Sequence, residues 1–443
     1  MSTAKPTAII LAAGLGTRMK SALPKAMHPI AGRPMIRHLL ASCDGLFDRI
    51  VVVAGPDMEV LERAAAPHAT VIQHDRLGTG HATLQAVEHF GTADVAVLYA
   101  DNPLIRRETI EALLARRRQG DAGLALLAMR PPEAGKYGRV IEEGGYVTRI
   151  VEWADASEAE RAVGLCNAGV LCASGENLAR WLRALKNDNS KGEYYLTDVV
   201  AMAVSEGLRA AAVEADSNEL RGINSRAELA EAEAVVQWRL RRAALDAGVT
   251  MTAPETVFLC ADTVFHPDVT VAPHVVFGPG VTVQSNAEIR AFSHLEGCIV
   301  GKGAIVGPFA RLRPGTELGE ESHVGNFVEL KATKLGKKSK ANHLAYIGDA
   351  SIGAGTNIGA GTITCNYDGY AKHRTEIGDN VFIGSDSILV APLSIGDGAL
   401  VTAGSVITEN VAADEMAFGR ARQTGKLGQA AAFRAKAQAK KKG

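Results

Sequence analysis

An aliphatic side chain recurs every six residues through the second half of this 443-residue chain. A period of six matches neither the 3.6-residue turn of an α-helix nor the simple alternation of a long strand. It is typical of a left-handed parallel β-helix of triangular cross-section, in which each hexad gives one short strand and three hexads give one coil. We therefore predict about nine stacked coils over residues 251–410, with the aliphatic residue of each hexad inside. The three in-phase series are Val271, Phe277, Val283, Ile289 and Leu295; Val306, Leu312, Leu318, Val324 and Leu330; and Ile377, Ile383, Leu389, Ile395, Val401 and Ile407.

Two interruptions of this period mark places where the coils change. Leu295 and Val306 are eleven residues apart, one short of two hexads, and Thr364 and Ile377 are thirteen apart. The second gap contains the polar and aromatic segment 365–374, which we expect to leave the coils as a loop. Insertions of this kind commonly carry the binding face of a repeat protein.

Residues 1–224 alternate β-rich apolar runs with helical patterns. This alternation is typical of an α/β, Rossmann-like domain with a mostly parallel sheet between helices. The runs are 7–12, 50–54, 95–100, 123–128 and 168–172, and the helical patterns include 34–43 and 107–118.

A helix over residues 225–248 is predicted to join the two halves. Ser225 is the expected N-cap, Glu228 completes a capping box, and Gly248 is a natural stop. At 1.5 Å per residue this helix is about 35 Å long, and it forms either a semi-rigid arm between domains or an ordinary helix that caps one of them. The predicted organisation is therefore a domain over 1–224, a linker helix over 225–248, a β-helix over 249–420 and a basic tail over 421–443 that is a frayed helix or disordered.

Composition argues against several classes of protein. Lys and Arg number 48 against 49 Asp and Glu, so no strong net field favours nucleic acid or an anionic membrane. The six cysteines include no C-x-x-C pair, which argues against a disulfide framework and a zinc site. No apolar run approaches the ~18 residues of a membrane span. We expect a cytoplasmic protein that acts on small molecules, without nucleic-acid binding or membrane insertion.

A glycine-rich turn follows the first predicted strand, at Gly14-Leu15-Gly16-Thr17-Arg18-Met19. Met19 stands where a Rossmann fingerprint requires a third glycine, and no Gly-Lys-Ser/Thr follows for a P-loop. The backbone N–H groups of such a turn, together with Arg18 and Lys25, suit the charge of a triphosphate. A plain strand-to-helix turn with surface cations explains these residues equally well.

The wider pattern resembles the sugar-phosphate nucleotidyltransferases, whose hallmark L-x-x-G-x-G-T-R-M followed by P-K is present in full. The resemblance implies that Arg18 and Lys25 are catalytic cations and that UTP is a substrate. It also implies that Asp101 and Asn224 hold Mg²⁺. UTP and the sugar would be bound by Leu11, Ala12, Ala13, Gly14, Lys25, Gln73, Gly78, Thr79, Tyr99, Ala100, Asp101, Gly138, Glu152, Asn167 and Asn224.

Asp101 has an independent physical rationale, because it follows an apolar strand at the edge where α/β folds present ligands. An Asp that merely begins a turn before Pro103 is the alternative. Ala100 and Asn102 depart from the family pattern, and the extra methyl group of Ala100 is expected to crowd the sugar.

The predicted β-helix carries a second group of polar residues. Arg313 and Lys331 are 18 residues apart, one full coil, so they are expected to stack on one edge as a phosphate seat or as solvated edge charges. His343 interrupts the aliphatic pattern, and an imidazole is well suited to accept a proton from an amine at neutral pH. A structural histidine is the alternative for this position.

The segments PFARLRPG, GNFVELK, H-L-x-Y-I-G-D and NIGAGTITCNYDG resemble the bacterial bifunctional N-acetylglucosamine-1-phosphate uridyltransferase / glucosamine-1-phosphate acetyltransferase family. With the N-terminal motifs, the resemblance covers about residues 7–420. It implies that His343 is the base of acetyl transfer, that acetyl-CoA is a co-substrate, and that a homotrimer builds each acetyl-transfer site between neighbouring prisms. Asn342 departs from the glycine that often precedes the base. Arg313, Lys331, Tyr346 and Asn357 would bind glucosamine 1-phosphate, and Ala360, Asn366, Tyr367, Ser385, Ala403 and Arg420 would contact acetyl-CoA.

The sequence therefore predicts a bifunctional enzyme of UDP-N-acetylglucosamine synthesis. Two alternatives remain at this point: a single-activity pyrophosphorylase with a structural β-helix, and a non-enzymatic scaffold built from the same two modules. The His343 cluster and the NYDG segment disfavour the first, and the retention of Arg18, Lys25 and Asp101 disfavours the second.

Overall fold

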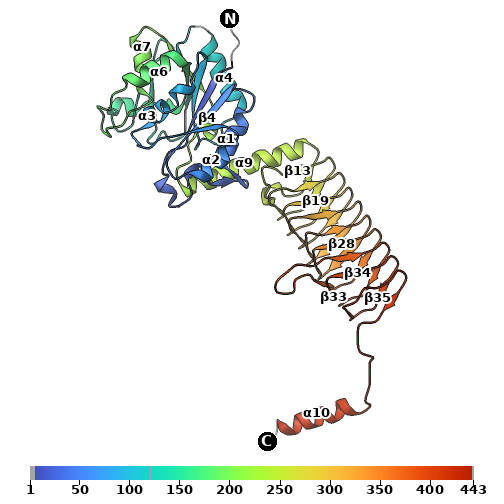
Figure 1. Cartoon of the computed structure of the whole chain (residues 1–443). Coiled ribbons are helices and arrows are strands. Elements are labelled where there is room, and N and C mark those ends of the chain that lie inside the picture. The colour runs from blue at the N-terminus through green and yellow to red at the C-terminus, as the bar shows by residue number, and fades with distance from the viewer. Residues whose placement is uncertain (1–4, 120, 442–443) are drawn as a thin grey trace. The chain divides into compact units, whose positions relative to one another are not determined.

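The computed structural model describes residues 5–119 and 121–441, which form two compact units. The first unit extends to Leu240 and the second begins at Arg241, so the boundary falls inside helix α9 (Arg226–Asp246). In Figure 1 the first unit is a sheet covered by helices, and the second is a stack of short strands.

A nine-stranded sheet forms the centre of the first unit, in the order β5-β4-β1-β6-β10-β7-β11-β9-β8. The pairs β5–β4, β4–β1, β1–β6 and β7–β11 are parallel, whereas β10 and the β8–β9 hairpin are antiparallel to their neighbours. The sheet is therefore mixed: most strands share one direction, as predicted, but β10 and β9 run the opposite way. Fully buried strands have similar apolar composition in either direction, which is why the sequence does not reveal the reversal. The strands are β1 (Thr7–Leu11), β4 (Arg49–Ala54), β5 (Ala69–Ile72), β6 (Asp94–Tyr99), β7 (Leu124–Met129), β8 (Arg139–Glu143), β9 (Tyr146–Val151), β10 (Cys166–Ser174) and β11 (Ala210–Glu214).

Two hydrophobic clusters lie on the two faces of this sheet. One includes Ile36, Leu61 and Ile110 from α1, α2 and α4, and the other includes Trp181 and Val200 from α6 and α7. Figure 1 shows α1, α2 and α4 on one side and α3, α6 and α7 on the other. The layered α/β domain is as predicted. The helices are α1 (Met35–Cys43), α2 (Glu59–Ala65), α3 (Thr79–Leu84), α4 (Arg107–Arg118), α5 (Glu158–Arg161), α6 (Gly175–Ala184), α7 (Asp198–Ser205) and α8 (Ser217–Leu220), with short 3₁₀ turns η1 (Thr17–Met19) and η2 (Lys25–Met27).

Helix α9 begins with a modified capping box. Ser225 Oγ accepts a hydrogen bond from Glu228 N at 3.2 Å, as a predicted N-cap should. The Glu228 carboxylate does not return to Ser225 but accepts from Asn224 N at 2.6 Å. The cap of α9 therefore also fixes the backbone of Asn224.

The second unit is a three-sided parallel β-helix whose faces are three separate sheets. In most coils the register pairs residues 17 or 18 positions apart, for example Leu312 with Leu330 and Leu330 with Ile347, and the spacing is 25 across the insertion, as for Ile358 with Ile383. Each of the sixteen predicted inward residues is buried, with at most 5% of its surface exposed. Burial of these side chains and the hydrogen bonds between coils hold the prism together.

The strands of the three faces follow one another along the chain. The first face comprises β12 (Thr250–Met251), β14 (Thr270–Val271), β17 (Glu288–Ile289), β20 (Ile305–Val306), β23 (His323–Asn326), β26 (Lys340–His343), β29 (Asn357–Ile358), β32 (Phe382–Ile383), β35 (Leu400–Val401) and β37 (Met416–Ala417). The second comprises β15 (Val276–Phe277), β18 (His294–Leu295), β21 (Arg311–Leu312), β24 (Glu329–Lys331), β27 (Tyr346–Gly348), β30 (Ile363–Cys365), β33 (Ile388–Val390) and β36 (Val406–Ile407). The third comprises β13 (Val264–Phe265), β16 (Thr282–Val283), β19 (Cys298–Val300), β22 (Thr316–Leu318), β25 (Lys334–Leu335), β28 (Ala350–Ile352), β31 (Thr375–Ile377) and β34 (Leu393–Ile395).

We call the turn from the first to the second face the first edge, the turn from the second to the third face the second edge, and the turn back to the first face the third edge. The five-residue spacings Leu295–Val300, Leu330–Leu335 and Ile347–Ile352 all cross the second edge. The predicted loop 365–374 also leaves at the second edge, and Figure 1 shows it projecting from the coils near β33. Changes in coil length are therefore concentrated at one edge of the prism.

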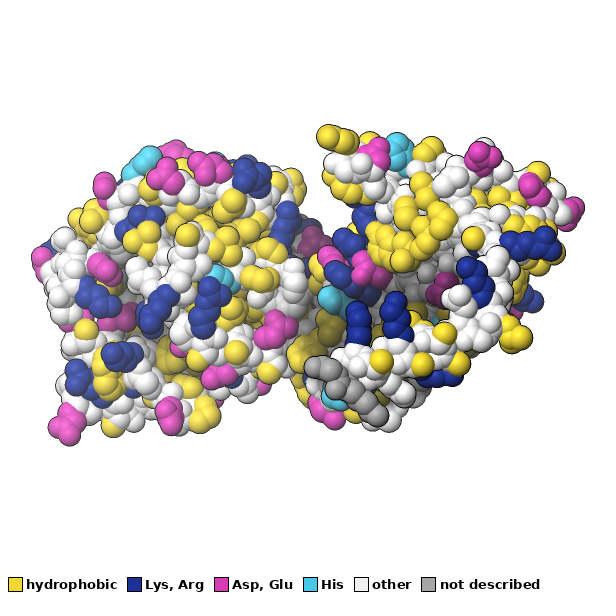
Figure 2. Space-filling model, turned by 90° about the horizontal axis from the view of Figure 1, so that it is seen from below, with side chains coloured by type: hydrophobic (Ala, Val, Ile, Leu, Met, Phe, Trp, Pro, Cys, Tyr) yellow, Lys and Arg dark blue, Asp and Glu magenta, His cyan; other side chains and the backbone are white. Residues whose placement is uncertain are grey.

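The cysteines, the tail and the surface charges complete the description. All six cysteines are free. The tail forms α10 (Gln429–Lys440), whose residues are all exposed. Among the described residues, no helix is both long and apolar enough to span a membrane. On the face drawn in Figure 2, acidic and basic side chains are interspersed over the first unit, as the balanced composition implies.

A core substitution tests the stacking. Ile289→Ala removes a fully buried side chain of β17 and is expected to lower the free energy of unfolding by about 2–5 kcal/mol in a urea titration. Lys334→Ala, which breaks an exposed ion pair with Glu317, is the control and is expected to cost less than about 1 kcal/mol. Equal effects of the two substitutions would contradict the inward position of the hexad aliphatics.

Candidate active sites

The glycine turn after β1 brings Lys25 back toward the end of that strand. Gly16 has φ +61°, and a Cβ atom there would lie 2.8 Å from Lys25 Cβ. Glycine is therefore required both for the left-handed backbone and for the close approach of Lys25. Arg18 lies in η1, is exposed and takes part in none of the ion pairs found among the described residues.

Helix α9 supports this turn from the other side. Arg226 Nε donates to Met19 O at 3.2 Å, and Arg226 Nη1 donates to His28 Nδ1 at 3.2 Å. Glu233 accepts from Ala31 N at 2.7 Å. The segment that carries Arg18 and Lys25 is thus held at both ends by one helix.

Two parallel strands bring the loop and Asp101 to the same edge of the sheet. Leu11 pairs with Tyr99, and Ala100 N donates to Leu11 O at 3.0 Å. Lys25 Nζ forms a short ion pair with Asp101 and donates to Asn224 Oδ1 at 3.1 Å. The predicted catalytic lysine and both predicted metal ligands therefore converge on one point.

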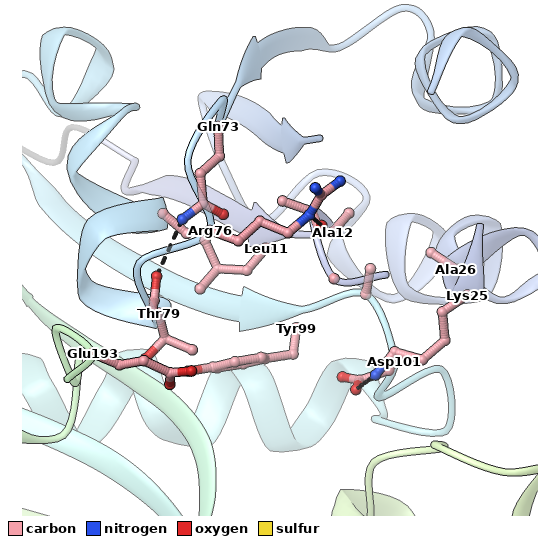
Figure 3. Close-up of a pocket in the computed structure, with 15 residues that line it drawn as sticks. Leu11, Ala12, Lys25, Ala26, Gln73, Arg76, Thr79, Tyr99, Asp101 and Glu193 are labelled. Atoms are coloured by element: carbon pink, nitrogen blue, oxygen red, sulfur yellow. Dashed lines mark hydrogen bonds and ion pairs between the residues drawn. The ribbon is translucent and has the colours of Figure 1, made fainter. Parts of the chain in front are cut away.

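A cavity of about 320 Å³ opens at this edge. In Figure 3 the Lys25–Asp101 pair lies at one side of it, and Gln73, Thr79 and Glu193 lie at the other. Eleven of the residues predicted to bind UTP and sugar line it: Leu11, Ala12, Ala13, Gly14, Lys25, Gln73, Gly78, Thr79, Tyr99, Ala100 and Asp101.

The far side of the cavity offers amide and backbone groups to a planar ligand. Gln73 is buried, and its Nε2 donates to Gly78 O at 3.3 Å. Thr79 Oγ1 accepts from Leu196 N at 3.1 Å, which fixes the start of α3. Arg76 and Glu193 also line the cavity, and the sequence analysis missed both. Arg76 could have been predicted, because it lies two residues before Gly78, a predicted nucleotide-binding residue. No sequence pattern indicated Glu193.

Gly138, Glu152 and Asn167 form a separate wall, outside the lining of that cavity. Asn167 N donates to Gly138 O at 2.9 Å, and a Cβ on Gly138 would lie 3.5 Å from Glu152 Oε1. Burial raises the pKa of the Glu152 carboxyl, while a 3.2 Å hydrogen bond from Thr197 Oγ1 acts in the opposite direction. The three residues predicted to bind the sugar therefore lie together.

A buried arginine lies directly behind this wall. Arg139 is 1% exposed and, among the described residues, has no carboxylate within ion-pair distance. Its guanidinium donates instead to the carbonyl oxygens of Ala134, Gly135, Tyr137 and Arg161. The guanidinium carbons of Arg139 and Arg161 lie 5.0 and 4.6 Å from the centroid of the Trp153 ring. Since an uncompensated buried cation is costly, these four acceptors and the ring define its role, which is to fix the strands that carry Gly138 and Glu152.

The donors around Lys25 suit a hard divalent cation. Asp101 and Asn224 each place an oxygen beside the ammonium group of Lys25. A divalent cation at that point would have oxygen ligands, which Mg²⁺ prefers. No cluster of three or more His, Cys, Asp or Glu side chains occurs in the described part of the chain. Such a sparse set fits Mg²⁺, which keeps water and substrate phosphates as its remaining ligands.

In the second unit, His343 lies on the first edge in a column of stacked residues. Asn326 pairs with His343, Gly361 N donates to His343 O, Asp386 N to Ala360 O, and Gly404 N to Ser385 O. His343 Nδ1 lies 2.8 Å from Asn326 Oδ1. Because that oxygen is an acceptor, Nδ1 carries the proton and Nε2 is free to accept one. Ala360, Ser385 and Ala403, three predicted acetyl-CoA contacts, follow His343 along this column.

The predicted phosphate seat lies on the second edge. Arg313 N donates to Leu330 O, so Arg313 and Lys331 occupy neighbouring coils. Lys331 Nζ lies 3.3 Å from both oxygens of Asp349, and Arg313 donates to Glu329 at 2.8 Å. A Cβ on Gly348 would lie 2.6 Å from both Tyr346 Oη and Asn366 Nδ2, so these two groups meet beside Lys331.

Lys372, in the inserted loop, is a third cation of this group that the sequence analysis did not single out. Its pKa is lowered because Lys331 lies within hydrogen-bonding range and both Lys331 and Arg313 repel a further positive charge. The loop is ordered by Asp368, which accepts from Tyr370 N and Ala371 N and lies 2.7 Å from His373 Nε2. The pKa of Lys331, in contrast, is raised by Lys372 and by Asp349. Three cations gathered at one edge suit an anionic ligand.

One chain therefore does not bring all the predicted acetyl-transfer residues together. His343 lies on the first edge, and Arg313, Lys331, Tyr346 and Asn366 lie at the second edge or on the strand leading to it. From His343 to Gly348, which pairs with Lys331, the chain crosses the second face in five residues, about 16 Å at about 3.3 Å per residue. Asn357 begins β29 on the first face, Tyr367 is in the loop, and Arg420 follows β37.

Two departures from the family pattern have structural explanations. Asn102 is buried, and its Nδ2 donates to Leu220 O at 2.6 Å, which ties the strand end at Asp101 to the segment leading to Asn224. Asn342 does not have a left-handed backbone, so glycine is not required before His343. Ala100 is buried in the cavity wall, as expected for a residue that limits its size.

Comparison with known proteins finds a match for each of the two units. Residues 8–194 match the MobA-like NTP transferase domain, and residues 374–409 match the hexapeptide repeat of succinyl-transferase. The chain is 67% identical to the bifunctional protein GlmU of Gluconacetobacter diazotrophicus, over 98% of this chain and 95% of that protein. It is 63% identical to the GlmU of Acidiphilium cryptum, over 97% and 98%, and 54% identical to that of Paramagnetospirillum magneticum, over 100% and 99%.

Fold, sites and matches define a two-part transferase, with a nucleotidyltransferase unit followed by a hexapeptide-repeat unit. The chain belongs to the family of bifunctional GlmU proteins. The family and the bifunctional transferase predicted from the sequence are thereby confirmed.

Arg139 can be tested by its loss. Arg139→Met removes the donor of four carbonyl groups from a buried position and is expected to lower the free energy of unfolding by at least about 3 kcal/mol. Arg139→Lys retains the charge but not the planar guanidinium group, so it is expected to keep only part of the stability that Arg139→Met loses. Arg161→Met, at an exposed arginine that also contacts Trp153, is the control and is expected to cost less than about 1 kcal/mol. A similar cost for both arginines would refute the bracing role of Arg139.

Proposed function

We propose that the chain makes UDP-N-acetylglucosamine in two steps, acetylating glucosamine 1-phosphate from acetyl-CoA and then transferring a uridylyl group from UTP. The convergence of Lys25, Asp101 and Asn224 beside a cavity lined by the predicted nucleotide residues is the observation that carries the second step. Residues 1–224 perform uridylyl transfer, 225–248 link the domains, and 249–420 perform acetyl transfer, in the cytoplasm.

Uridylyl transfer is an in-line displacement at phosphorus. A phosphate oxygen of N-acetylglucosamine 1-phosphate forms a bond to the α-phosphorus of UTP as the bond to the β-phosphate bridge oxygen breaks, and pyrophosphate leaves. No protein nucleophile is needed, because positioning and charge neutralisation lower the barrier. Lys25 and Arg18 offset the charge of the triphosphate, Gln73 and Gly78-Thr79 hold the base, and the wall of Gly138, Glu152 and Asn167 holds the sugar.

Asp101 and Asn224 are the residues that hold Mg²⁺. When bound, the ion supplies positive charge to the phosphates of UTP. Asp101 is placed by the β1–β6 pairing, and Asn224 by the cap of α9.

Acetyl transfer uses His343 as the base. Its Nε2 accepts a proton from the glucosamine amine, the nitrogen bonds to the thioester carbonyl carbon, and the C–S bond breaks to release coenzyme A as the thiolate, which is then protonated. Asn326 holds the ring in the required tautomer. Arg313, Lys331 and Tyr346 bind the sugar phosphate, and Ala360, Asn366, Tyr367, Ser385, Ala403 and Arg420 contact acetyl-CoA.

The division of these residues between two edges supports a homotrimer. A sugar phosphate is far shorter than the face that separates His343 from Lys331 within one chain. A neighbouring copy supplies the missing side of each site. The single-activity pyrophosphorylase is disfavoured because it gives no reason for the column of His343, Ala360, Ser385 and Ala403.

His343→Ala is expected to reduce thiol release from acetyl-CoA with glucosamine 1-phosphate by at least about 100-fold, since the general base is lost. Pyrophosphate release from UTP should remain unchanged because its residues lie in the other unit. His294→Ala, an exposed histidine of β18, serves as control. Loss of both activities in His343→Ala would contradict the assignment of the two sites to separate domains.

Asp101→Ala is expected to have the opposite effect, lowering pyrophosphate release by at least about 100-fold through loss of charge stabilisation at the phosphates. Acetyl transfer should persist. Asp57→Asn, an exposed residue that retains a left-handed backbone, is the matched control. Full UTP turnover in Asp101→Ala with an unchanged Mg²⁺ requirement would rule out the metal role.

A further inference from the structure

Arg76 is a cation of the nucleotide cavity to which the proposed function gives no role. It lies in the segment between β5 and α3, which also carries Gln73 and Gly78, and it lines the cavity of about 320 Å³. Arg76 is exposed, and among the described residues it forms no ion pair. In Figure 3 its side chain extends toward Ala12, which follows β1. An exposed guanidinium without a carboxylate partner is available to a ligand in this cavity.

The backbone on either side fixes the position of the Arg76 guanidinium. Arg76 Nε donates to Ala13 O at 2.8 Å. A Cβ on Gly55, which follows β4, would lie 2.5 Å from Arg76 Nη2, although Gly55 does not have a left-handed backbone. Glycine is therefore needed at position 55 for space, and the guanidinium occupies that space. Among the described residues, the Nη groups of Arg76 donate no hydrogen bond.

Gln73 presents a hydrogen-bond acceptor to the same cavity. Its Nε2 donates to Gly78 O at 3.3 Å and lies 3.1 Å from His81 Nδ1. Because a carbonyl oxygen can only accept, these contacts fix the orientation of the amide group. Gln73 Oε1 accepts no hydrogen bond from the residues that the structure describes. The cavity therefore offers a ligand one acceptor, Gln73 Oε1, and the Nη donors of Arg76.

This combination of an acceptor and donors matches uracil and not cytosine. Uracil has an N3–H donor next to the acceptor O4, whereas cytosine has an unprotonated N3 next to an amino group. Uracil N3–H can donate to Gln73 Oε1 while O4 accepts from Arg76. Cytosine in the same position places an acceptor against Gln73 Oε1 and a donor against Arg76. A guanidinium has no acceptor atom and cannot reverse its role, so the unpaired groups make cytosine binding costly.

The position of Arg76 favours the base over the phosphates as its partner. Arg76 shares the segment 73–78 with Gln73, which the proposed function assigns to the base. Lys25, which is assigned to the phosphates, lies at the other side of the cavity, where it pairs with Asp101. The charge of the phosphates is offset on that side. A donor on the segment 73–78 is therefore placed to contact the base.

We propose that Arg76 is a specificity-determining residue of uridylyl transfer, which donates to O4 of uracil while Gln73 Oε1 accepts from N3–H. The inference rests on the proposed function and deepens it, because it names the side chains that select UTP over CTP. Gly55 contributes indirectly, since it leaves the space in which the guanidinium lies. Arg76 takes no part in the displacement at phosphorus.

The test measures pyrophosphate release by the full chain from UTP, CTP and 4-thio-UTP, with N-acetylglucosamine 1-phosphate as acceptor. Arg76→Gln is expected to lower kcat/KM for UTP by about 10–100-fold, since a hydrogen bond from a charged donor is lost. For CTP, kcat/KM should stay unchanged or rise, because glutamine also offers an acceptor. Sulfur is a weak acceptor, so the wild-type chain should use 4-thio-UTP at least about fivefold less well than UTP, and Arg76→Gln should use the two about equally.

Two further variants complete the test. Gly55→Ala displaces the guanidinium, so it is expected to lower the preference for UTP over CTP as Arg76→Gln does, with little further loss when the two are combined. Arg49→Gln is the control, because it removes an exposed arginine from the opposite end of β4. This control should keep both the rate with UTP and the preference for UTP.

Equal losses with UTP, CTP and 4-thio-UTP in Arg76→Gln would overturn the inference, because they would assign Arg76 to the phosphates or to support of the turn at Ala13. A wild-type chain that uses CTP as well as UTP would overturn it too. Either result would leave the proposed function standing, since the wild-type chain still releases pyrophosphate from UTP. A wild-type chain that releases none would overturn the proposed uridylyl transfer itself.

Discussion

Hydrogen bonding between successive coils is the constraint on which the second half of this molecule depends. It makes neighbours of residues that are mostly 17 or 18 positions apart, and 25 apart across the insertion, and the buried hexad side chains keep the coils in that register. His343, Ala360, Ser385 and Ala403 come from different coils, yet they lie in one column because no coil can slip against the next. In the first unit, the β1–β6 pairing likewise brings distant residues together, because it places Asp101 opposite the glycine turn.

Much of this arrangement was predictable from the sequence. The period of six determines which residues point inward, and all sixteen predicted positions are buried. The glycine turn, the strand before Asp101 and the loop 365–374 also carry clear local signals. These features could be predicted because each depends on a short-range pattern or on a repeat that is visible in a single sequence.

Other features depend on contacts that no local pattern encodes. The antiparallel direction of β10 is invisible because a buried strand has the same composition in either direction. The Glu228 carboxylate accepts a hydrogen bond from Asn224 N rather than from Ser225 N, and this partner is determined by the tertiary structure. Arg139 follows Gly138, a predicted sugar-binding residue, but only the folded chain shows that no carboxylate of the described residues pairs with it and that it contacts Trp153. Lys372 lies close to Lys331 only because the loop 365–374 folds back against the coils, which no local pattern predicts.

Beyond Val271, variation in coil length is confined to the second edge, where the five-residue spacings and the insertion all occur. A residue added or removed there lengthens or shortens a turn without rotating any strand of the first face. His343 and the residues after it on the first edge are therefore insulated from such changes. A protein of this design can acquire new loops at the second edge while the column of His343, Ala360, Ser385 and Ala403 is preserved.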